Sequence, residues 1–119
     1  MSETLVRLDP IPTAPFSASL VTVQAAPPMA RFSLRARSAA DVARLLGEDV
    51  PDKIGGMAHG VACLGPDEWL LLAPAGRVCP LDATGAVAIT DVSDRNIGLI
   101  LEGARAAAIL ATGCPLDLD

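Results

Sequence analysis

Aromatic and basic side chains are scarce in this sequence of 119 residues. It has no Tyr, two Phe and one Trp, and its nine Lys and Arg stand against 14 Asp and Glu, for a formal net charge of −5. Proteins that bind nucleic acids neutralise phosphates with clustered Lys and Arg, and many stack bases on aromatic rings. Because both features are missing here, the sequence predicts no nucleic-acid partner.

A membrane span, a signal peptide and a cysteine framework are missing as well. No stretch approaches the ~20 apolar residues that cross a bilayer, and the residues after Met1 are Ser, Glu and Thr, with no basic region. The cysteines Cys63, Cys79 and Cys114 are odd in number and lack Cys-x-x-Cys spacing. We therefore expect a cytoplasmic protein without membrane contacts.

Hydrophobic residues make up 51% of the chain, which is enough for one packed core. The first thirty residues differ from the rest because they carry five prolines, which favour extended backbone. We expect residues 1–30 to form an extended N-terminal arm and residues 31–119 to form an α+β domain. The arm is either a frayed terminus or, because Phe16 and its neighbours are apolar, a segment that lies on a partner.

The spacing of apolar residues predicts the strands and helices. Polar and apolar residues alternate over 31–36, which is typical of a strand with one buried face. Ser38 and Asp41 have capping-box spacing and Gly47 supplies a left-handed stop, so a helix is expected between them. Two apolar runs, 57–64 and 69–73, flank a Gly-Pro-Asp turn and predict a hairpin that contains Trp69. Further strands are expected at 86–90 and 97–101, and a second helix at 104–111.

This order of elements predicts an α+β fold with a ferredoxin-like split β-α-β plan. The sheet is expected to be antiparallel or mixed, with two helices on one face. A ferredoxin-like plan places a last strand after the second helix, and the final strand is apparently missing here.

Few residues have catalytic potential. His59 is the one histidine, and neither it nor the cysteines stand beside a recognisable partner residue. The densest polar cluster is Asp91-Val92-Ser93-Asp94-Arg95, in which Asp91 and Ser93 fit a turn between strands. A catalytic role for Asp91 stays open, and Asp94 and Arg95 are candidates for pairing with each other or with a partner chain. The sequence thus predicts no catalytic, cofactor or metal site.

Several segments together resemble a known family. The sequence is similar to the gamma subunit of heterotetrameric sarcosine oxidase over roughly residues 30 to 119, most specifically in the turn Gly65-Pro66-Asp67-Glu68-Trp69 and the segment Gly113-Cys114-Pro115-Leu116-Asp117-Leu118. The segment 91–93 is shared more widely, including with folate-binding aminomethyltransferases. Members of the gamma family usually continue with a second α/β half, so the resemblance covers the N-terminal half of that architecture.

The resemblance implies a function. The complex oxidatively demethylates sarcosine to glycine, with FAD, FMN and NAD in larger subunits, zinc in a small subunit and tetrahydrofolate as one-carbon acceptor. The gamma subunit has a fold like that of the folate-binding domain, is thought to bind no cofactor, and packs on the alpha subunit, with beta and delta completing the complex. We therefore expect a non-catalytic accessory subunit that supports assembly through interface candidates Phe16, Trp69, Asp91, Ser93, Asp94 and Arg95. The alternative is a stand-alone folate-binding or aminomethyltransferase-like domain with Asp91 facing the folate.

Overall fold

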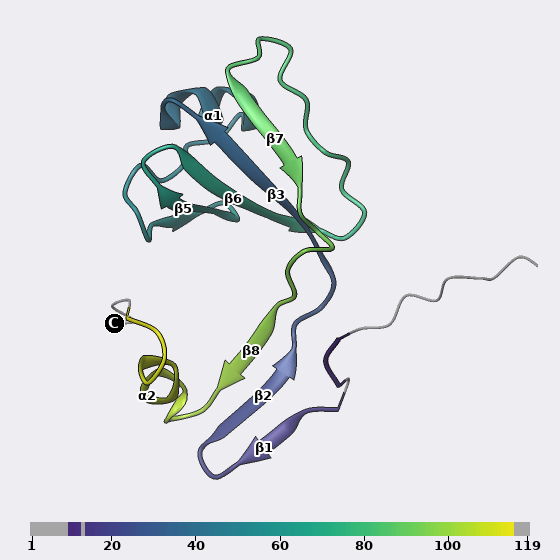
Figure 1. Ribbon diagram of the computed structural model, residues 1–119, viewed down its shortest axis with the longest axis vertical. Helices are drawn as coiled ribbons and strands as arrows, with labels where there is room; N and C mark the ends of the chain where they lie inside the picture. The colour runs from purple at the N-terminus through teal and green to yellow at the C-terminus, as the bar shows by residue number, and fades with distance from the viewer. Residues whose placement is uncertain (1–9, 13, 116–119) are drawn as a thin grey trace, which may run out of the picture. The chain divides into compact units, whose positions relative to one another are not determined.

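The computed structural model describes residues 10–12 and 14–115 (Figure 1). They form two compact units. One consists of residues Pro28–Ile97, and the other combines the segment that ends at Pro27 with the segment that begins at Gly98. We call the first the central unit and the second the terminal unit.

The central unit is built on a five-stranded antiparallel sheet in the order β4-β5-β6-β3-β7. Its middle strand β3 pairs with β6 on one side and with β7 on the other. The strands are β3 (Met29–Ala36), β4 (Met57–Ala58), β5 (Val61–Gly65), β6 (Glu68–Pro74) and β7 (Val87–Asp91). The hairpin of β5 and β6 is the one predicted around the Gly-Pro-Asp turn.

One helix, α1 (Ala39–Leu46), packs against this sheet and contributes Val42 to its core. The Asp41 N–H donates to Ser38 Oγ at 3.3 Å, and Gly47 ends the helix at φ 75° with its N–H bonded to Ala43 O. Both predicted caps are therefore confirmed. The largest fully buried side chains of the core are Trp69, Phe32, Leu34, Val42, Val61 and Cys63.

The terminal unit contains a three-stranded antiparallel sheet in the order β1-β2-β8 and a short helix. The elements are β1 (Phe16–Ala18), β2 (Val21–Ala25), β8 (Leu99–Glu102) and α2 (Ala106–Ala111). Within the described part of the predicted arm, residues 16–25 form a β-hairpin that pairs with β8. The first nine residues of the arm and residue 13 lie outside the described residues.

The predicted α+β class is confirmed, with two helices and antiparallel sheets that agree with a ferredoxin-like plan. One detail of the predicted arrangement is wrong. The strand at 97–101 appears as β8 and pairs with β2, so the strands form two sheets, and α1 and α2 belong to different units. Hydrophobic periodicity shows which face of a strand is buried but not which strand lies beside it.

Candidate interaction surfaces

The Asp91–Arg95 segment forms a turn that fastens β7 to β3. Ser93 donates its backbone N–H to Asp91 Oδ1 at 2.9 Å and its hydroxyl to the same oxygen at 2.6 Å. The Ser93 oxygen also accepts the N–H of Arg31 at 3.0 Å, and the Val92 N–H donates to Arg31 O at 2.9 Å. This geometry agrees with the predicted role of Asp91 and Ser93 in a turn.

The Asp91 carboxylate is committed to the turn. The Ser93 hydroxyl and then the Ser93 N–H hold the pKa of Asp91 below its usual range, against a smaller opposing effect of burial. A hydrogen-bonded, ionised carboxylate suits the fixing of a turn. It is poorly suited to accepting a proton near neutral pH, because a low pKa makes it a weak base.

Arg31 completes the turn from the opposite strand, and it departs from the sequence prediction. The alternating pattern over 31–36 placed Arg31 on the solvent face, yet the residue is 8% exposed. Its Nη1 donates to Asn96 O at 3.0 Å and to Met29 O at 3.4 Å. These carbonyl partners explain how a buried guanidinium is tolerated beside the turn.

The remaining predicted interface residues separate into exposed and buried ones. Asp94 and Arg95 are exposed at the turn, where the Arg95 N–H donates to Val92 O at 3.0 Å. Phe16 lies on β1 of the terminal unit and is 66% exposed. Trp69 is 2% exposed, and its Nε1 donates to Pro51 O at 2.8 Å. It is a core residue and offers no surface to a partner, because β5 and β3 flank it on the sheet.

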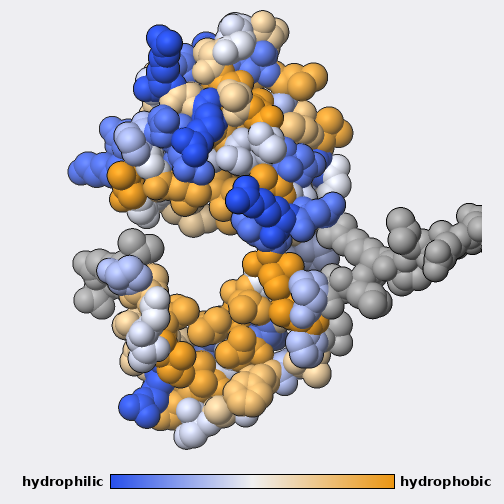
Figure 2. Space-filling model, in the orientation of Figure 1, coloured by the Kyte–Doolittle hydropathy of each residue, from blue (hydrophilic) through white to orange (hydrophobic). Residues whose placement is uncertain are grey.

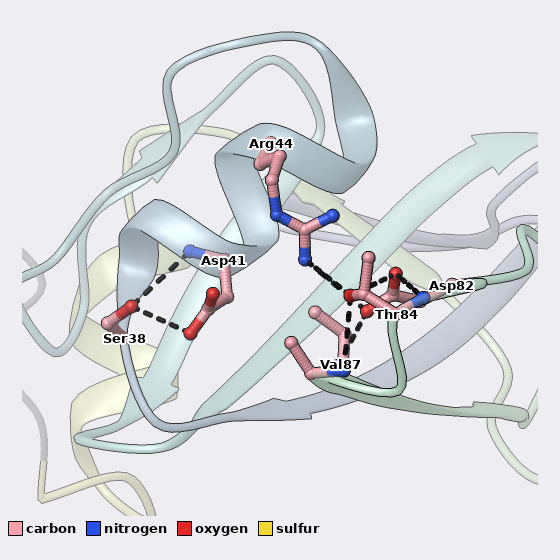
Figure 3. Close-up of polar contacts among 7 residues, drawn as sticks. Ser38, Asp41, Arg44, Asp82, Thr84 and Val87 are labelled. Carbon is pink, nitrogen blue, oxygen red and sulfur yellow. Dashed lines mark hydrogen bonds and ion pairs between the residues drawn. The ribbon is translucent and has the colours of Figure 1, made fainter.

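A second polar cluster, which the sequence analysis missed, is centred on Asp82 (Figure 3). Its Oδ1 accepts the N–H and the hydroxyl of Thr84 at 3.0 and 2.8 Å, and its Oδ2 accepts the Val87 N–H at 2.9 Å. Arg44 of α1 lies 3.4 Å from Oδ2 and donates to Thr84 Oγ1 at 3.0 Å. The Asp82 side chain is 2% exposed. We call Arg44, Asp82, Thr84 and Val87 the Asp82 lock, because they tie α1 to the start of β7.

The Asp82 lock predicts a loss of stability in acid. The pKa of Asp82 lies far below its usual range, chiefly because its carboxylate accepts a hydrogen bond from the Thr84 hydroxyl. The Thr84 and Val87 N–H groups and Arg44 lower this pKa further. Because the folded pKa is depressed, this stabilisation is complete above the unfolded value of about 4 and is lost as the pH falls towards the folded one. We expect the urea concentration at the unfolding midpoint to decrease as the pH is lowered from 5 to 2.5. In Asp82→Asn this decrease should be smaller than in wild type.

Asp91 contributes with the same sign, so some pH dependence remains in Asp82→Asn. The exposed Asp49 provides the matched control, since Asp49→Asn removes a carboxylate outside the lock. An Asp82→Asn profile with the wild-type slope would contradict the account.

Next to the lock, residues 78–81 present two large apolar side chains to solvent. Val78 is 84% exposed and Leu81 is 89% exposed, while Cys79 between them packs against the core. We call the segment Val78–Leu81 the docking loop. Cys79 lies on the inner side of this loop, and the Asp82 lock follows the loop in the chain.

Part of the Asp82 lock and of the neighbouring loop can be predicted from the sequence. An Asp followed two residues later by Thr is a signal for a side-chain turn, and Val and Leu are unexpected in a loop between Pro74 and Gly85. The contribution of Arg44 cannot be predicted from the sequence, since Arg44 stands 38 positions before Asp82.

Residues 10–12 and 14–115 contain neither a cluster of metal-ligating side chains nor a helix that could span a membrane. No three His, Cys, Asp or Glu side chains gather there in a way that suits a metal ion. Neither of the helices described has the length and apolarity to cross a bilayer.

No protein-family model matches the chain. The sarcosine oxidase subunit gamma of Arthrobacter sp. is 35% identical to it over 89 residues, which cover 66% of this chain and 44% of the relative. The subunit gamma from Corynebacterium sp. (strain P-1) is 33% identical over 89 residues, with the same shares covered. The chain thus spans less than half the length of these curated relatives.

A solved structure agrees with the sequence matches. One chain of the heterotetrameric sarcosine oxidase from Corynebacterium sp. U-96, in complex with pyrrole 2-carboxylate, is similar with a TM-score of 0.62 and 28% identity. The similarity covers 83% of this chain and 58% of the other. The chain is thus similar in sequence to part of the sarcosine oxidase subunit gamma and similar in fold to one chain of a heterotetrameric sarcosine oxidase.

Proposed function

We propose that the chain is a non-catalytic gamma-type subunit of a heterotetrameric sarcosine oxidase and supports assembly by packing on the alpha subunit. In this proposal it takes part in the oxidative demethylation of sarcosine to glycine only through the complex. FAD, FMN, NAD, zinc and tetrahydrofolate are held or used by the other subunits, and beta and delta complete the assembly in the cytoplasm.

The observation that carries the proposal is the docking loop in a homologue of a heterotetramer subunit. Val78 and Leu81 are the most exposed large apolar side chains of the described residues. Burying a Val or Leu side chain contributes about 1.5 to 3 kcal/mol each. A partner that covers both side chains would remove their apolar surface from water, which favours binding.

The folate-binding alternative depends on Asp91. That carboxylate accepts two hydrogen bonds from Ser93 through one oxygen and fixes the end of β7. We therefore assign Asp91 to the turn and prefer the assembly role.

Co-expression tests the role of the docking loop. We expect the tagged chain to co-purify with the sarcosine oxidase alpha subunit of the same organism, and Val78→Asp with Leu81→Asp to weaken this binding about 100-fold, since both anchors become charged. Binding is measured by titration of the purified alpha subunit.

The control places the same charge change elsewhere on the central unit. Ile54 and Met57 are 66% and 62% exposed, so Ile54→Asp with Met57→Asp makes a matched double variant and is expected to bind like wild type. All four residues are exposed, so both variants should melt as wild type does. Equal binding by the docking-loop variant and the control would refute the docking loop as the contact.

A further inference from the structure

Each exposed apolar side chain of the docking loop is next in the chain to a residue with contacts inside the central unit. Val78 is 84% exposed and precedes Cys79, which packs against the hydrophobic core. Leu81 is 89% exposed and precedes Asp82, whose side chain is 2% exposed at the centre of the Asp82 lock. The contacts of Cys79 and Asp82 therefore limit where the two apolar side chains can lie.

The proline between these contacts restricts the backbone further. Pro80 has a fixed φ, and its ring disfavours helical backbone at the preceding residue, Cys79. The backbone from Cys79 to Asp82 thus has few conformations when both of its ends are held. Release of one end would add conformations, because free residues regain conformational entropy.

The Thr84 hydroxyl is the central contact of the Asp82 lock (Figure 3). It donates to Asp82 Oδ1 at 2.8 Å and accepts from Arg44 Nη2 at 3.0 Å. The same oxygen also accepts the Ala86 N–H at 3.4 Å. One hydroxyl group therefore joins the residue that follows the docking loop to α1 and to the residue before β7.

Helix α1 is held by the core independently of the loop. Val42 on α1 is 0% exposed, and Ser38 and Gly47 cap the two helix ends. The Arg44 side chain is 46% exposed, and ion pairs in contact with solvent contribute little stability. The larger effect on the lock is therefore expected from Thr84.

The surface of the central unit makes the position of the docking loop important. In this unit, on the face that Figure 2 shows, hydrophobic residues are interspersed with hydrophilic ones. On a mixed surface, binding depends on a few apolar side chains whose positions match the partner. A loop that is mobile before binding loses conformational entropy when it binds, and this loss weakens the complex.

We propose that the Asp82 lock positions the docking loop and that Thr84 is a positioning residue for partner binding. While the lock is intact, Cys79 stays packed against the core, and Val78 and Leu81 keep defined positions. When the lock opens, the docking loop leaves the core while the five-stranded sheet stays folded. The use of the positioned loop in binding rests on the function proposed above, whereas the positioning itself does not.

The cysteines of the full chain allow a direct test. We expect iodoacetamide to alkylate Cys79 on the order of 10-fold faster in Thr84→Val than in wild type, because Val has the shape of Thr but its side chain forms no hydrogen bonds. Thr84→Ser keeps the hydroxyl and should react at the wild-type rate. The rate at each cysteine is measured by mass spectrometry of the digested protein.

Cys63 and Cys114 show whether the opening is local. Cys63 on β5 is 1% exposed, and Cys114 follows α2 in the terminal unit. Both should react in Thr84→Val as they do in wild type. An unchanged Cys79 rate would overturn the proposal, and so would an equal acceleration at Cys63, since the core would then open as a whole.

Binding measurements separate this inference from the proposed function. Asp82→Ala removes the carboxylate at the centre of the lock, so most molecules should have an open loop and bind the purified alpha subunit about 10-fold more weakly. The exposed Asp49 again provides the matched control, and Asp49→Ala should bind like wild type. If the wild-type chain does not bind, the proposed function is refuted, and the alkylation rates still decide whether the lock positions the loop. If wild type and Asp82→Ala bind equally well, the role of the lock in binding is overturned.

Discussion

Trp69→Ala is expected to destabilise the central unit by about 3 to 5 kcal/mol. Trp69 is 2% exposed and stands opposite Leu34 of β3 and Cys63 of β5. Its removal leaves a large cavity in the core and takes the donor from Pro51 O. Because small domains are stable by only about 5 to 15 kcal/mol, this one change brings the unit close to unfolding. Urea denaturation followed by far-UV circular dichroism measures the loss.

The matched variant Trp69→Phe keeps an aromatic ring in the core and removes the indole N–H. It should cost clearly less than Trp69→Ala, because most of the packing is retained while one buried hydrogen bond, worth about 1 kcal/mol, is lost. If Trp69→Ala unfolds at the wild-type urea concentration, Trp69 does not occupy the core position assigned to it.

Gly60→Ala is expected to destabilise the central unit by about 1 to 3 kcal/mol through backbone strain. His59 and Gly60 connect β4 and β5 with φ values of 50° and 76°, the combination that two-residue hairpin turns require. A Cβ at position 60 would lie 2.7 Å from Leu72 O, while the Leu72 N–H donates to Gly60 O at 2.7 Å. The new methyl group therefore pushes against β6 at a hydrogen-bonded position.

His59→Asn is the control at the neighbouring position. Asn adopts positive φ readily and precedes Gly in many such turns. The free energy of unfolding of His59→Asn should therefore stay within about 0.5 kcal/mol of the wild-type value. Thermal melts of the two variants side by side make the comparison. Equal melting temperatures for Gly60→Ala and wild type would show that the turn relaxes without strain.

Local features of this fold are predictable from the sequence because their physical causes are local. Ser38 and Gly47 bound α1 as their cap chemistry indicates, and Asp91 and Ser93 form the turn that their side chains favour. The hairpin of β5 and β6 follows from two apolar runs and a turn between them. In each case the interacting groups lie within about a dozen residues of one another in the chain.

Features that depend on distant contacts are not predictable in this way. The pairing of β8 with β2 joins Leu99 to Ala25, and no local pattern specifies that choice. The burial of Arg31 depends on Asn96 O, which is 65 positions away. Trp69 reads as an interface candidate beside a turn, and its burial results from packing across three strands.

The central proposal is that this chain binds the sarcosine oxidase alpha subunit. The most direct test is to mix the purified chain with that subunit at micromolar concentration and to measure the mass of the eluted species by light scattering. We expect one species whose mass is that of the alpha subunit plus the 12.2 kDa of this chain. Separate elution of the two proteins, each at its own mass, would contradict it.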